Sequence, residues 1–492
     1  MQPTPLRRSL HLLTAFALVL SQLILLSTST ALAAPAVVVN SSGDLGDVSA
    51  GDGVCFTGAL LPGLTPECTL RAAIEEANAS AVDEISFDIP NSDPGFSGGT
   101  WVIEPAAVLP SITQAVSIDA STQPGFGGTP IVILDGSTAL TSPGGTDGLL
   151  LDTDGATIRG LVIRDYEDDG IEIHGDGNTI VGNHIFGNDS GVLIENGTDN
   201  IVGSPSSADR NVISDNRNNG VAVTGGDRSL IRNNYIGVDV TGGSSFANTG
   251  SGIAIYGTST DVEIGAGNVI SGNTGAGILV DGAGSTVSIV GNYVGLNAAG
   301  TAAIPNGTVG VSVAAAAGTV DIGGGGPGDG NVISGNTGHG VELTFGAGIV
   351  TISNNLVGTN PSGTGAIGNG GDGIHADSDA VVIEDNQVSG NAVDGIRVER
   401  LDATVRGNLV GTDAAGTGAI PNGDDGIDTG SGTVGTLIGG TGPGDGNVIA
   451  FNTDNGIVLR GFAGTTAAIL SNSVFGNGGL GIDLNDDGPT PN

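Results

Sequence analysis

The sequence predicts an all-β chain wound as a right-handed parallel β-helix, a solenoid with a short N-terminal capping helix. Three observations predict this fold: a recurring Gly-[Ile/Val]-x-apolar phrase, 90 glycines among 492 residues, and only 3% aromatic residues. A chain of this length with so few large side chains cannot fill several globular cores. A solenoid can accommodate it, because each repeat packs only on its neighbours.

The repeat itself predicts three short strands per coil. One minimal unit, GIEIHGDGNTIVGNHIFGNDS at 170–190, contains three pieces with apolar residues at alternate positions, GIEI, NTIV and NHIF. Alternation of this kind indicates strands with one buried face, and the intervening Gly, Asn and Asp favour tight corners. Stacking such coils in parallel buries their inner faces, and the handedness of parallel crossovers favours the right-handed form. The repeat glycines are Gly170, Gly191, Gly220, Gly252, Gly277, Gly310, Gly340, Gly373, Gly395, Gly426, Gly456 and Gly481.

Four longer segments interrupt the repeat at equivalent places. They cover residues 237–252, 295–310, 358–373 and 411–426, and each follows the same strand of its coil. We therefore expect all four insertions to leave one corner of the solenoid and to form a wall along it. Asparagines that precede comparable strands, such as Asn183 and Asn234, are expected to form ladders of stacked amides at another corner.

The first 33 residues have the composition of an export signal. Arg7 and Arg8 precede a long apolar run at 10–26, and ALAA at 31–34 offers a cleavage site after Ala33. This pattern predicts a secreted or cell-surface protein with no membrane span in the mature chain. An uncleaved membrane anchor is the alternative, since the apolar run is long for a signal.

Residues 34–100 are expected to form an N-terminal cap, followed by the β-helix over 101–492. The cap contains the two cysteines of the chain, Cys55 and Cys68, which in an exported protein predict a disulfide. It also contains CTLRAAIEEANA at 68–79, whose apolar residues fall on one face at helical spacing. A helix there would cover the exposed strand edges of the first coil.

The charge limits the partners of this chain. The net charge is −39, with 13 arginines and no lysine. Nucleic acid is excluded, because it requires basic contacts to phosphate, and unaided binding of polyanionic sugars is disfavoured. Cations, neutral glycans and basic partners remain.

Two segments carry a family resemblance. CTLRAAIEEANA, followed by LPSITQAVSIDASTQPGFGGTPIVILDG at 109–136, resembles the opening of CSLREA-type secreted proteins, although Cys-Thr-Leu-Arg-Ala-Ala replaces the name-giving Cys-Ser-Leu-Arg-Glu-Ala. The later coils resemble the pectin-lyase-like β-helix superfamily. The resemblance implies an exported β-helix, and it implies a truncated C-terminus because the family continues beyond a segment like GIDLNDDGPTPN.

The repeat alignment also predicts a polar patch. After each Gly-[Ile/Val] the next residue points outward, and four successive coils place Glu342, His375, Arg397 and Asp428 in one column. Flanking positions add His339 before Gly340, the second column Asp372, Asp394 and Asp425, and the outward residues Asp377 and Glu399. Both columns are expected to face solvent beside the insertions. They are interpreted either as opposite-charge neighbours along a sheet or as a ligand-binding patch.

A second cluster, YEDDGIEIHGDGN at 166–178, suggests calcium. Its carboxylates Asp168, Asp169, Glu172 and Asp176 are the ligand type that calcium prefers. The alternative is a solvated face of the first coils. Calcium is the one cofactor that the sequence favours. The sequence contains no motif for a nucleotide, flavin or haem.

These observations lead to two functional hypotheses. The first is a non-catalytic surface protein that binds a polysaccharide or another cell-surface component through the patch. The alternative is a carbohydrate-active enzyme, a polysaccharide lyase, epimerase or hydrolase, that uses the residues around His375 and Arg397. The sequence does not identify catalytic residues.

Overall fold

The computed structural model describes residues 36–139, 145–314, 317–431, 433–461 and 466–488. The predicted export signal at 1–33 lies outside these ranges. No helix within them has the length and apolar character that a membrane span requires.

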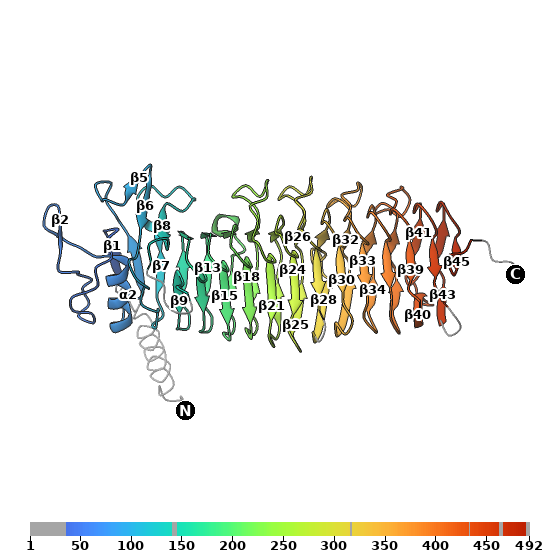
Figure 1. The fold of residues 1–492 in the computed structure, drawn as a ribbon, viewed down its shortest axis with the longest axis horizontal. Coiled ribbons are helices and arrows are strands. Elements are labelled where there is room, and N and C mark those ends of the chain that lie inside the picture. The colour runs from blue at the N-terminus through green and yellow to red at the C-terminus, as the bar shows by residue number, and fades with distance from the viewer. Residues whose placement is uncertain (1–35, 140–144, 315–316, 432, 462–465, 489–492) are drawn as a thin grey trace, which may run out of the picture. The chain divides into compact units, whose positions relative to one another are not determined.

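Three long sheets form the fold, with 15, 15 and 13 strands, and strands of successive coils lie side by side in each (Figure 1). The chain passes from sheet 1 to sheet 2 to sheet 3 and back to sheet 1. All strand pairs in these sheets are parallel except β5 with β6.

Sheet 1 contains β1 (Ala36–Val39), β4 (Glu84–Phe87), β7 (Ser117–Asp119), β10 (Thr157–Arg159), β13 (Thr179–Val181), β16 (Ile201–Val202), β19 (Leu230–Ile231), β22 (Val262–Ile264), β25 (Thr286–Ile289), β28 (Thr319–Gly323), β31 (Ile349–Ser353), β34 (Val382–Glu384), β37 (Thr404–Arg406), β40 (Val434–Gly439) and β43 (Thr466–Leu470). Sheet 2 contains β5 (Phe96–Ser97), β6 (Thr100–Ile103), β8 (Val132–Asp135), β11 (Leu161–Arg164), β14 (His184–Phe186), β17 (Val212–Ile213), β20 (Tyr235–Ile236), β23 (Val269–Ile270), β26 (Tyr293–Val294), β29 (Val332–Ile333), β32 (Leu356–Val357), β35 (Gln387–Val388), β38 (Leu409–Val410), β41 (Val448–Ala450) and β44 (Ser473–Phe475). Sheet 3 contains β9 (Leu149–Leu151), β12 (Ile171–Ile173), β15 (Val192–Glu195), β18 (Val221–Thr224), β21 (Ile253–Tyr256), β24 (Ile278–Asp281), β27 (Val311–Val313), β30 (Val341–Leu343), β33 (Ile374–Ala376), β36 (Ile396–Val398), β39 (Ile427–Thr429), β42 (Ile457–Leu459) and β45 (Ile482–Leu484). The other elements of the described residues are a hairpin of β2 (Leu60–Leu61) and β3 (Thr65–Pro66), the helix α2 (Leu70–Ala79), and two 3-10 turns, Ala120–Thr122 and Ser207–Asp209.

The predicted three-strand unit is confirmed. GIEI, NTIV and NHIF become β12, β13 and β14, one in each sheet. The apolar residues at alternate positions point inward, as with Ile171, Ile173, Ile180 and Ile185, which are all fully buried. The core is therefore a set of short aliphatic rows along the inside of the stack.

Close approach of successive coils requires the glycine before every sheet 3 strand except the last, where Gly481 has only Val474 Cγ1 at 3.7 Å. A β-carbon on Gly395 would lie 2.6 Å from the carbonyl oxygen of Gly426 in the next coil and 2.6 Å from Val410 Cγ1. Gly373 and Gly426 face the same kind of contact with the glycine that follows each of them. The repeat phrase begins with glycine because successive coils approach too closely there for any side chain.

Two ladders of asparagines, buried except in the last coil, line the corners on either side of sheet 2. In the first, Asn211 Oδ1 accepts the backbone N–H of Asn183 at 3.0 Å, and Asn211 Nδ2 donates to the carbonyl of Ile180 at 2.8 Å. This ladder consists of Asn183, Asn211, Asn234, Asn268, Asn292, Asn331, Asn355, Asn386, Asn408, Asn447 and Asn472. The sequence predicts five of these members, Asn183, Asn234, Asn292, Asn355 and Asn408. The second, which the sequence analysis missed, consists of Asn188, Asn216, Asn248, Asn273, Asn306, Asn336, Asn369, Asn391, Asn422, Asn452 and Asn477.

The four insertions leave one corner, as expected, because each follows a strand of sheet 2: β20, β26, β32 or β38. They fold back over sheet 2, however, and not beside the face of sheet 3. Gln387 in β35 donates to the carbonyl oxygens of Gly363 and Thr412 at 2.8 Å, one from each of two insertions. Tyr235 and Tyr293 pack against the buried Val238 and Ile304 of the first two insertions. The outer face of sheet 2 is rich in apolar side chains, and the insertions cover them.

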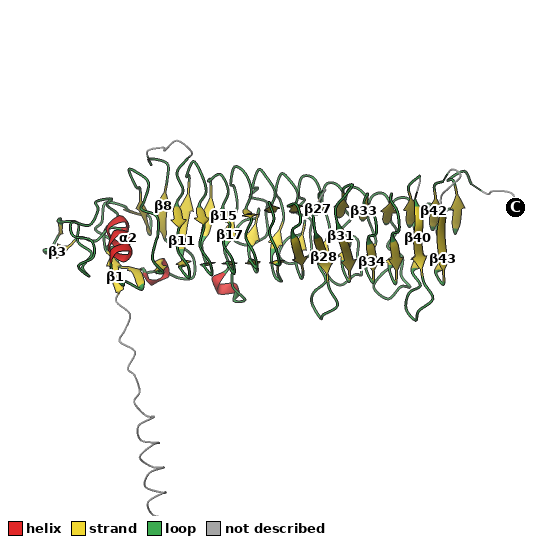
Figure 2. Cartoon of the chain, turned by 90° about the horizontal axis from the view of Figure 1, so that it is seen from below, coloured by secondary structure: helices red, strands yellow, loops and turns green. Residues whose placement is uncertain are grey.

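The cap is built around α2, which lies at the end of the stack nearest β1 (Figure 2). Thr69 caps the helix, because its side chain accepts the N–H of Ala72. The predicted apolar face is buried, and it comprises Leu70, Ala73, Ile74 and Ala77. The segment 34–100 also supplies β1 and β4 to sheet 1, so this sheet begins within the cap.

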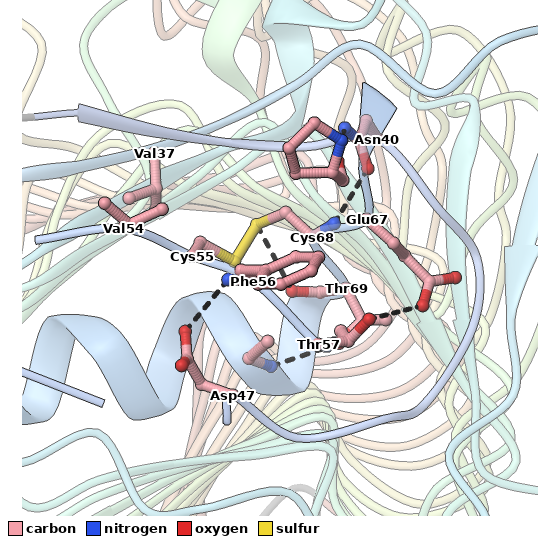
Figure 3. Close-up of a disulfide and its surroundings, with 12 residues drawn as sticks. Val37, Asn40, Asp47, Val54, Cys55, Phe56, Thr57, Glu67, Cys68 and Thr69 are labelled. Atoms are coloured by element: carbon pink, nitrogen blue, oxygen red, sulfur yellow. Dashed lines mark hydrogen bonds between the residues drawn. A yellow bond between two sulfur atoms is a disulfide. The ribbon is translucent and has the colours of Figure 1, made fainter. Parts of the chain in front are cut away.

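The disulfide between Cys55 and Cys68 is present, as predicted, and joins the loop that precedes the β2–β3 hairpin to the start of the helix (Figure 3). Hydrogen bonds brace the same region. Asn40 Oδ1 accepts the backbone N–H of Cys68 at 2.9 Å, and Thr57 donates its hydroxyl to Glu67 at 2.6 Å. The disulfide therefore closes a loop that is already tied to the first strand of sheet 1.

Replacing both cysteines by alanine is expected to lower the free energy of unfolding of the cap by about 3 kcal/mol, because the unfolded chain gains the entropy of a 13-residue loop. Chemical denaturation monitored by hydrogen exchange of α2 measures this effect. Mass spectrometry of non-reduced peptides checks the bond in the native protein, and two free thiols there would contradict the assignment.

Gly395→Ala is expected to destabilise the fold by about 3 kcal/mol, since the new β-carbon meets backbone as well as side chains. Gly416→Ala is the matched control in an insertion. Gly416 has a φ of 71°, but its β-carbon would meet no atom closer than 3.4 Å, so we expect a loss of only about 1 kcal/mol. Equal shifts in melting temperature for the two variants would contradict the explanation by close approach.

Candidate functional site

The predicted patch lies on the outer face of sheet 3, where β30, β33, β36 and β39 are neighbours. The strand register pairs Glu342 with His375, His375 with Arg397, and Arg397 with Asp428. Paired positions in adjacent parallel strands lie about 5 Å apart. The four residues therefore form the single column that the repeat alignment predicts.

The members of this column differ in exposure. Glu342, His375 and Arg397 are half-buried, whereas Asp428 is fully buried. The expectation that the whole column faces solvent is therefore wrong at Asp428. Arg460, directly after β42, covers this residue, with its Nε 2.9 Å from each carboxylate oxygen.

The second column, Asp372, Asp394 and Asp425, is also buried, which corrects the expectation that it faces solvent. Each carboxylate accepts the backbone N–H of its counterpart in the next coil: Asp394 N–H to Asp372 at 3.1 Å, and Asp425 N–H to Asp394 at 3.0 Å. Asn219 does the same for Ser251 earlier in the stack. These aspartates are buried because a corner N–H needs an acceptor there.

The last two predicted patch residues are held in ion pairs. Asp377 pairs with Arg400, and Glu399 lies 2.8 Å from Arg397 Nε. All predicted patch residues thus occupy four neighbouring coils. The remaining contacts of Arg397 are with Asp428 at 3.3 Å and Asp394 at 3.7 Å.

Two histidines share one carboxylate in this patch. His375 Nδ1 lies 2.9 Å from Asp372 Oδ2, and His339 Nδ1 lies 3.4 Å from the same oxygen. The two rings are 4.7 Å apart between centroids. His339 Nδ1 also accepts the backbone N–H of Asp372 at 2.9 Å. Aligning the residues that precede repeat glycines finds this pair, because His339 and Asp372 hold equivalent positions.

Arg460 is the residue of the patch that the sequence analysis missed. A signal for it exists, because Arg460 holds the outward position that Asp377 and Glu399 hold in earlier coils. Gly430 holds this position in the coil between Glu399 and Arg460 and interrupts the run of charged residues.

The carboxyl groups of this patch have shifted pKa values, which are raised for some aspartates and lowered for another. Burial, reinforced by Asp372 and Asp428, raises the pKa of Asp394 to about 7. Burial also raises the pKa of Asp425 to about 6. Burial acts on Asp372 in the same direction, but the hydrogen bonds from His375 and from the backbone N–H of Asp394 outweigh it and lower its pKa. The bond to Asp372 in turn raises the pKa of His375.

The patch lies on the outer face of sheet 3, and two hollows lie in other parts of the described structure. One of about 870 Å³ is at the cap and is lined in part by Val38, Leu60 and Pro90. Another of about 310 Å³ lies on sheet 2 between Phe186, Val240 and Phe246.

The predicted calcium cluster is only partly brought together. Asp168 and Asp169 have carboxylate oxygens within 4.8 Å of each other and of Asp147. Glu172 groups with His174 and Glu195, and its carboxyl group is also within hydrogen-bond reach of Asp147. Asp176 lies at another corner, where it accepts the N–H of Thr198.

The sequence analysis missed Asp147 and Glu195 in this region. Asp147 could have been found from the repeat, because it lies 22 residues before Asp169 and accepts its N–H, just as Asp169 accepts that of Ser190. The first group, Asp147, Asp168 and Asp169, offers the oxygen ligands that calcium takes.

Comparison with known proteins supports the fold. Residues 142–322 match the family model described as the right handed beta helix region. With the three parallel sheets, this match identifies the fold as a right-handed parallel β-helix, as the sequence predicts. A search of curated proteins finds no match.

Several solved structures are similar to this chain. The Dettilon tailspike protein is 13% identical with a TM-score of 0.41, over 84% of this chain and 64% of the tailspike. The A-module of an Azotobacter vinelandii mannuronan C-5 epimerase is 14% identical with a TM-score of 0.42, over 86% of this chain and 95% of that module. A Streptococcus pneumoniae surface protein and adhesin is 11% identical with a TM-score of 0.36, over 91% of this chain and 99% of the adhesin. This chain thus spans less than two thirds of the tailspike's length.

Asp394→Asn is expected to stabilise the protein at alkaline pH. The pKa of Asp394 is about 7 in the fold, whereas an unfolded aspartate titrates near about 4. Between these values the folded state retains a proton that the unfolded state releases, so the free energy of unfolding falls as pH rises. Asparagine still accepts the N–H of Asp425 but carries no titrating group, so it removes this loss. We expect the substitution to raise the free energy of unfolding by about 2 kcal/mol at a pH of about 8 and to change it little below a pH of about 4.

Urea denaturation across this pH range measures the effect. Asp281→Asn, an exposed position on the same sheet, is the control. Parallel pH profiles for wild type and Asp394→Asn would contradict the raised pKa.

Proposed function

We propose that this chain is an exported β-helix protein that binds a neutral polysaccharide of a cell surface along the outer face of sheet 3, without transforming it. The observation that carries the proposal is the column of half-buried Glu342, His375 and Arg397 on an open face. Three earlier coils fill the same column with Leu193, Ala222 and Ala254 and so fold without a charged group there. Export is supported by the predicted signal and by the disulfide.

The side chains of the patch suit a ligand rich in hydroxyl groups. Imidazole, guanidinium and carboxylate groups together offer donors and acceptors at closely spaced positions. Phe345 adds an exposed aromatic ring, with the Arg400 guanidinium 4.6 Å from its centroid. Such a ring provides apolar surface next to polar groups.

The balance of charge favours a neutral ligand over an acidic one. Three arginines, Arg397, Arg400 and Arg460, stand against seven carboxylic acids. Those acids are Glu342, Asp372, Asp377, Asp394, Glu399, Asp425 and Asp428. A polyanionic sugar would meet net repulsion here.

The engagement of the carboxylates argues against catalysis. Asp372, Asp394 and Asp425 accept backbone N–H groups of the next coil, and Asp428 is enclosed by Arg460. A glycosidase requires two carboxyl groups that both reach the scissile bond. In this patch the buried carboxyl groups form hydrogen bonds and ion pairs within the fold.

One observation favours the enzyme as a second candidate. A carboxyl group with a pKa of about 7, as at Asp394, is well matched to general acid catalysis at neutral pH. Asp394 is only 1% exposed, however, so a substrate would have to displace Arg397 to reach it.

A glycan array probed with the purified mature protein tests the binding proposal. Arg397→Ala should weaken binding to any captured glycan at least tenfold, while the melting temperature changes little because Asp428 keeps its contact with Arg460. Arg406→Ala removes an arginine from an ion pair with Glu384 on sheet 1 and should leave binding unchanged.

The same glycans are then incubated with the protein, with and without calcium, and assayed for new reducing ends and unsaturated products. Turnover that Asp394→Asn abolishes would replace the binding proposal by the enzyme. Glycan binding that is equal in wild type and Arg397→Ala would show that the patch is a solvated face.

A further inference from the structure

We propose that His339, Asp372 and His375 form a binding site for a divalent first-row transition metal, with Zn²⁺ as the representative ion. This inference goes beyond the proposed glycan binding and does not depend on it. The three residues come from two adjacent coils, His339 from the corner before β30 and the other two from the corner and strand of β33.

The distances between the donor atoms fit a small metal ion. One donor atom from each residue lies within 4.8 Å of the others. Zinc binds nitrogen and oxygen ligands at about 2.0–2.2 Å, which separates ligands of a tetrahedral site by about 3.3–3.5 Å. His339 Nδ1 already lies 3.4 Å from Asp372 Oδ2. His375 Nδ1 lies 2.9 Å from the same oxygen, so this pair would open by about 0.5 Å.

The central carboxylate is held in place from behind. Asp372 Oδ1 accepts the backbone N–H of Asp394 at 3.1 Å, which leaves Oδ2 directed at the two imidazoles. In metal sites, a hydrogen bond to the other oxygen of a ligating carboxylate commonly orients the ligand in this way. The strands on either side are paired in register, so the corner is rigid.

The nitrogen of His339 that faces Asp372 is in the form that a metal needs. Because His339 Nδ1 accepts the backbone N–H of Asp372, this nitrogen carries a lone pair and no proton. A bound metal would compete with the backbone N–H of Asp372 for this lone pair. Both imidazole side chains are partly exposed, 28% for His339 and 21% for His375, so an ion can enter from solvent.

The donor set selects the class of metal. Two imidazoles and one carboxylate suit zinc and its first-row neighbours, whereas calcium and magnesium take oxygen ligands. Three protein ligands leave one position open, where a hydroxyl or carboxylate group of a ligand could bind. The negative charge of the surrounding patch also favours a cation.

The other group that contains a histidine is less suitable. His174 has both of its nitrogens engaged, Nδ1 with Asp152 at 2.7 Å and Nε2 with Glu172 at 3.0 Å. It also offers only one imidazole. It therefore serves as an internal comparison for the test.

The experiment measures Zn²⁺ binding by isothermal titration calorimetry on untagged protein that has been treated with a chelator. We expect one Zn²⁺ per chain, a rise in melting temperature, and no binding of Ca²⁺ at this site. His339→Asn is the main variant, since asparagine occupies the same ladder position at 219 and 455 and so preserves the corner. It should weaken Zn²⁺ binding at least tenfold, as should His375→Ala, while His174→Ala should not.

Absence of Zn²⁺ binding by the wild type would overturn the proposal. So would unchanged binding in His339→Asn, or a loss confined to His174→Ala. If His375→Ala fails to fold, His339→Asn and the Co²⁺ absorption spectrum of the wild type decide, because a tetrahedral site with nitrogen ligands has characteristic visible bands. Arg397 is not one of the three ligands, so the glycan experiment fails or succeeds separately.

Discussion

Hydrogen bonding at the corners of the coils is the constraint on which the rest of this structure depends. At each corner the backbone leaves the sheet and its N–H and C=O groups lose their strand partners while remaining buried. Asparagine is suited to this place because its amide carries both a donor and an acceptor, and two ladders use it on either side of sheet 2. A buried group left unpaired costs about 1–3 kcal/mol, and the loss would recur in every coil.

The same constraint divides the charged residues of sheet 3 into two kinds. Residues before the repeat glycine, such as Asp372 and Asp394, satisfy backbone N–H groups and are therefore buried. Residues within the strands, such as His375 and Arg397, point away from the core and need no partner for folding. The second kind is free to evolve toward a ligand, whereas the first kind must also keep its hydrogen bond to the backbone and sets the electrostatic background of the patch.

The electrostatic environment differs between equivalent corner positions of successive coils. Asp372 and Asp394 hold the same place in successive coils, yet the pKa of Asp372 is lowered and that of Asp394 is raised. The difference arises because two histidines face Asp372, whereas Asp394 lies between other carboxylates with Arg397 no closer than 3.7 Å. In a chain of net charge −39, the hydrogen bond from His375 thus separates two otherwise equivalent carboxyl groups.

The sequence by itself determined the three strands of each coil, their register and the column from Glu342 to Asp428. It could do so because a parallel stack transfers the period-two pattern of one coil to the next without a shift. Tertiary structure alone decided that Asp425 and Asp428 are buried, that Arg460 covers Asp428, that the insertions fold over sheet 2, and that Asp176 lies apart from Asp168. A repeat shows which positions are equivalent, but the path of a corner and the reach of a long side chain depend on the packing of each particular coil.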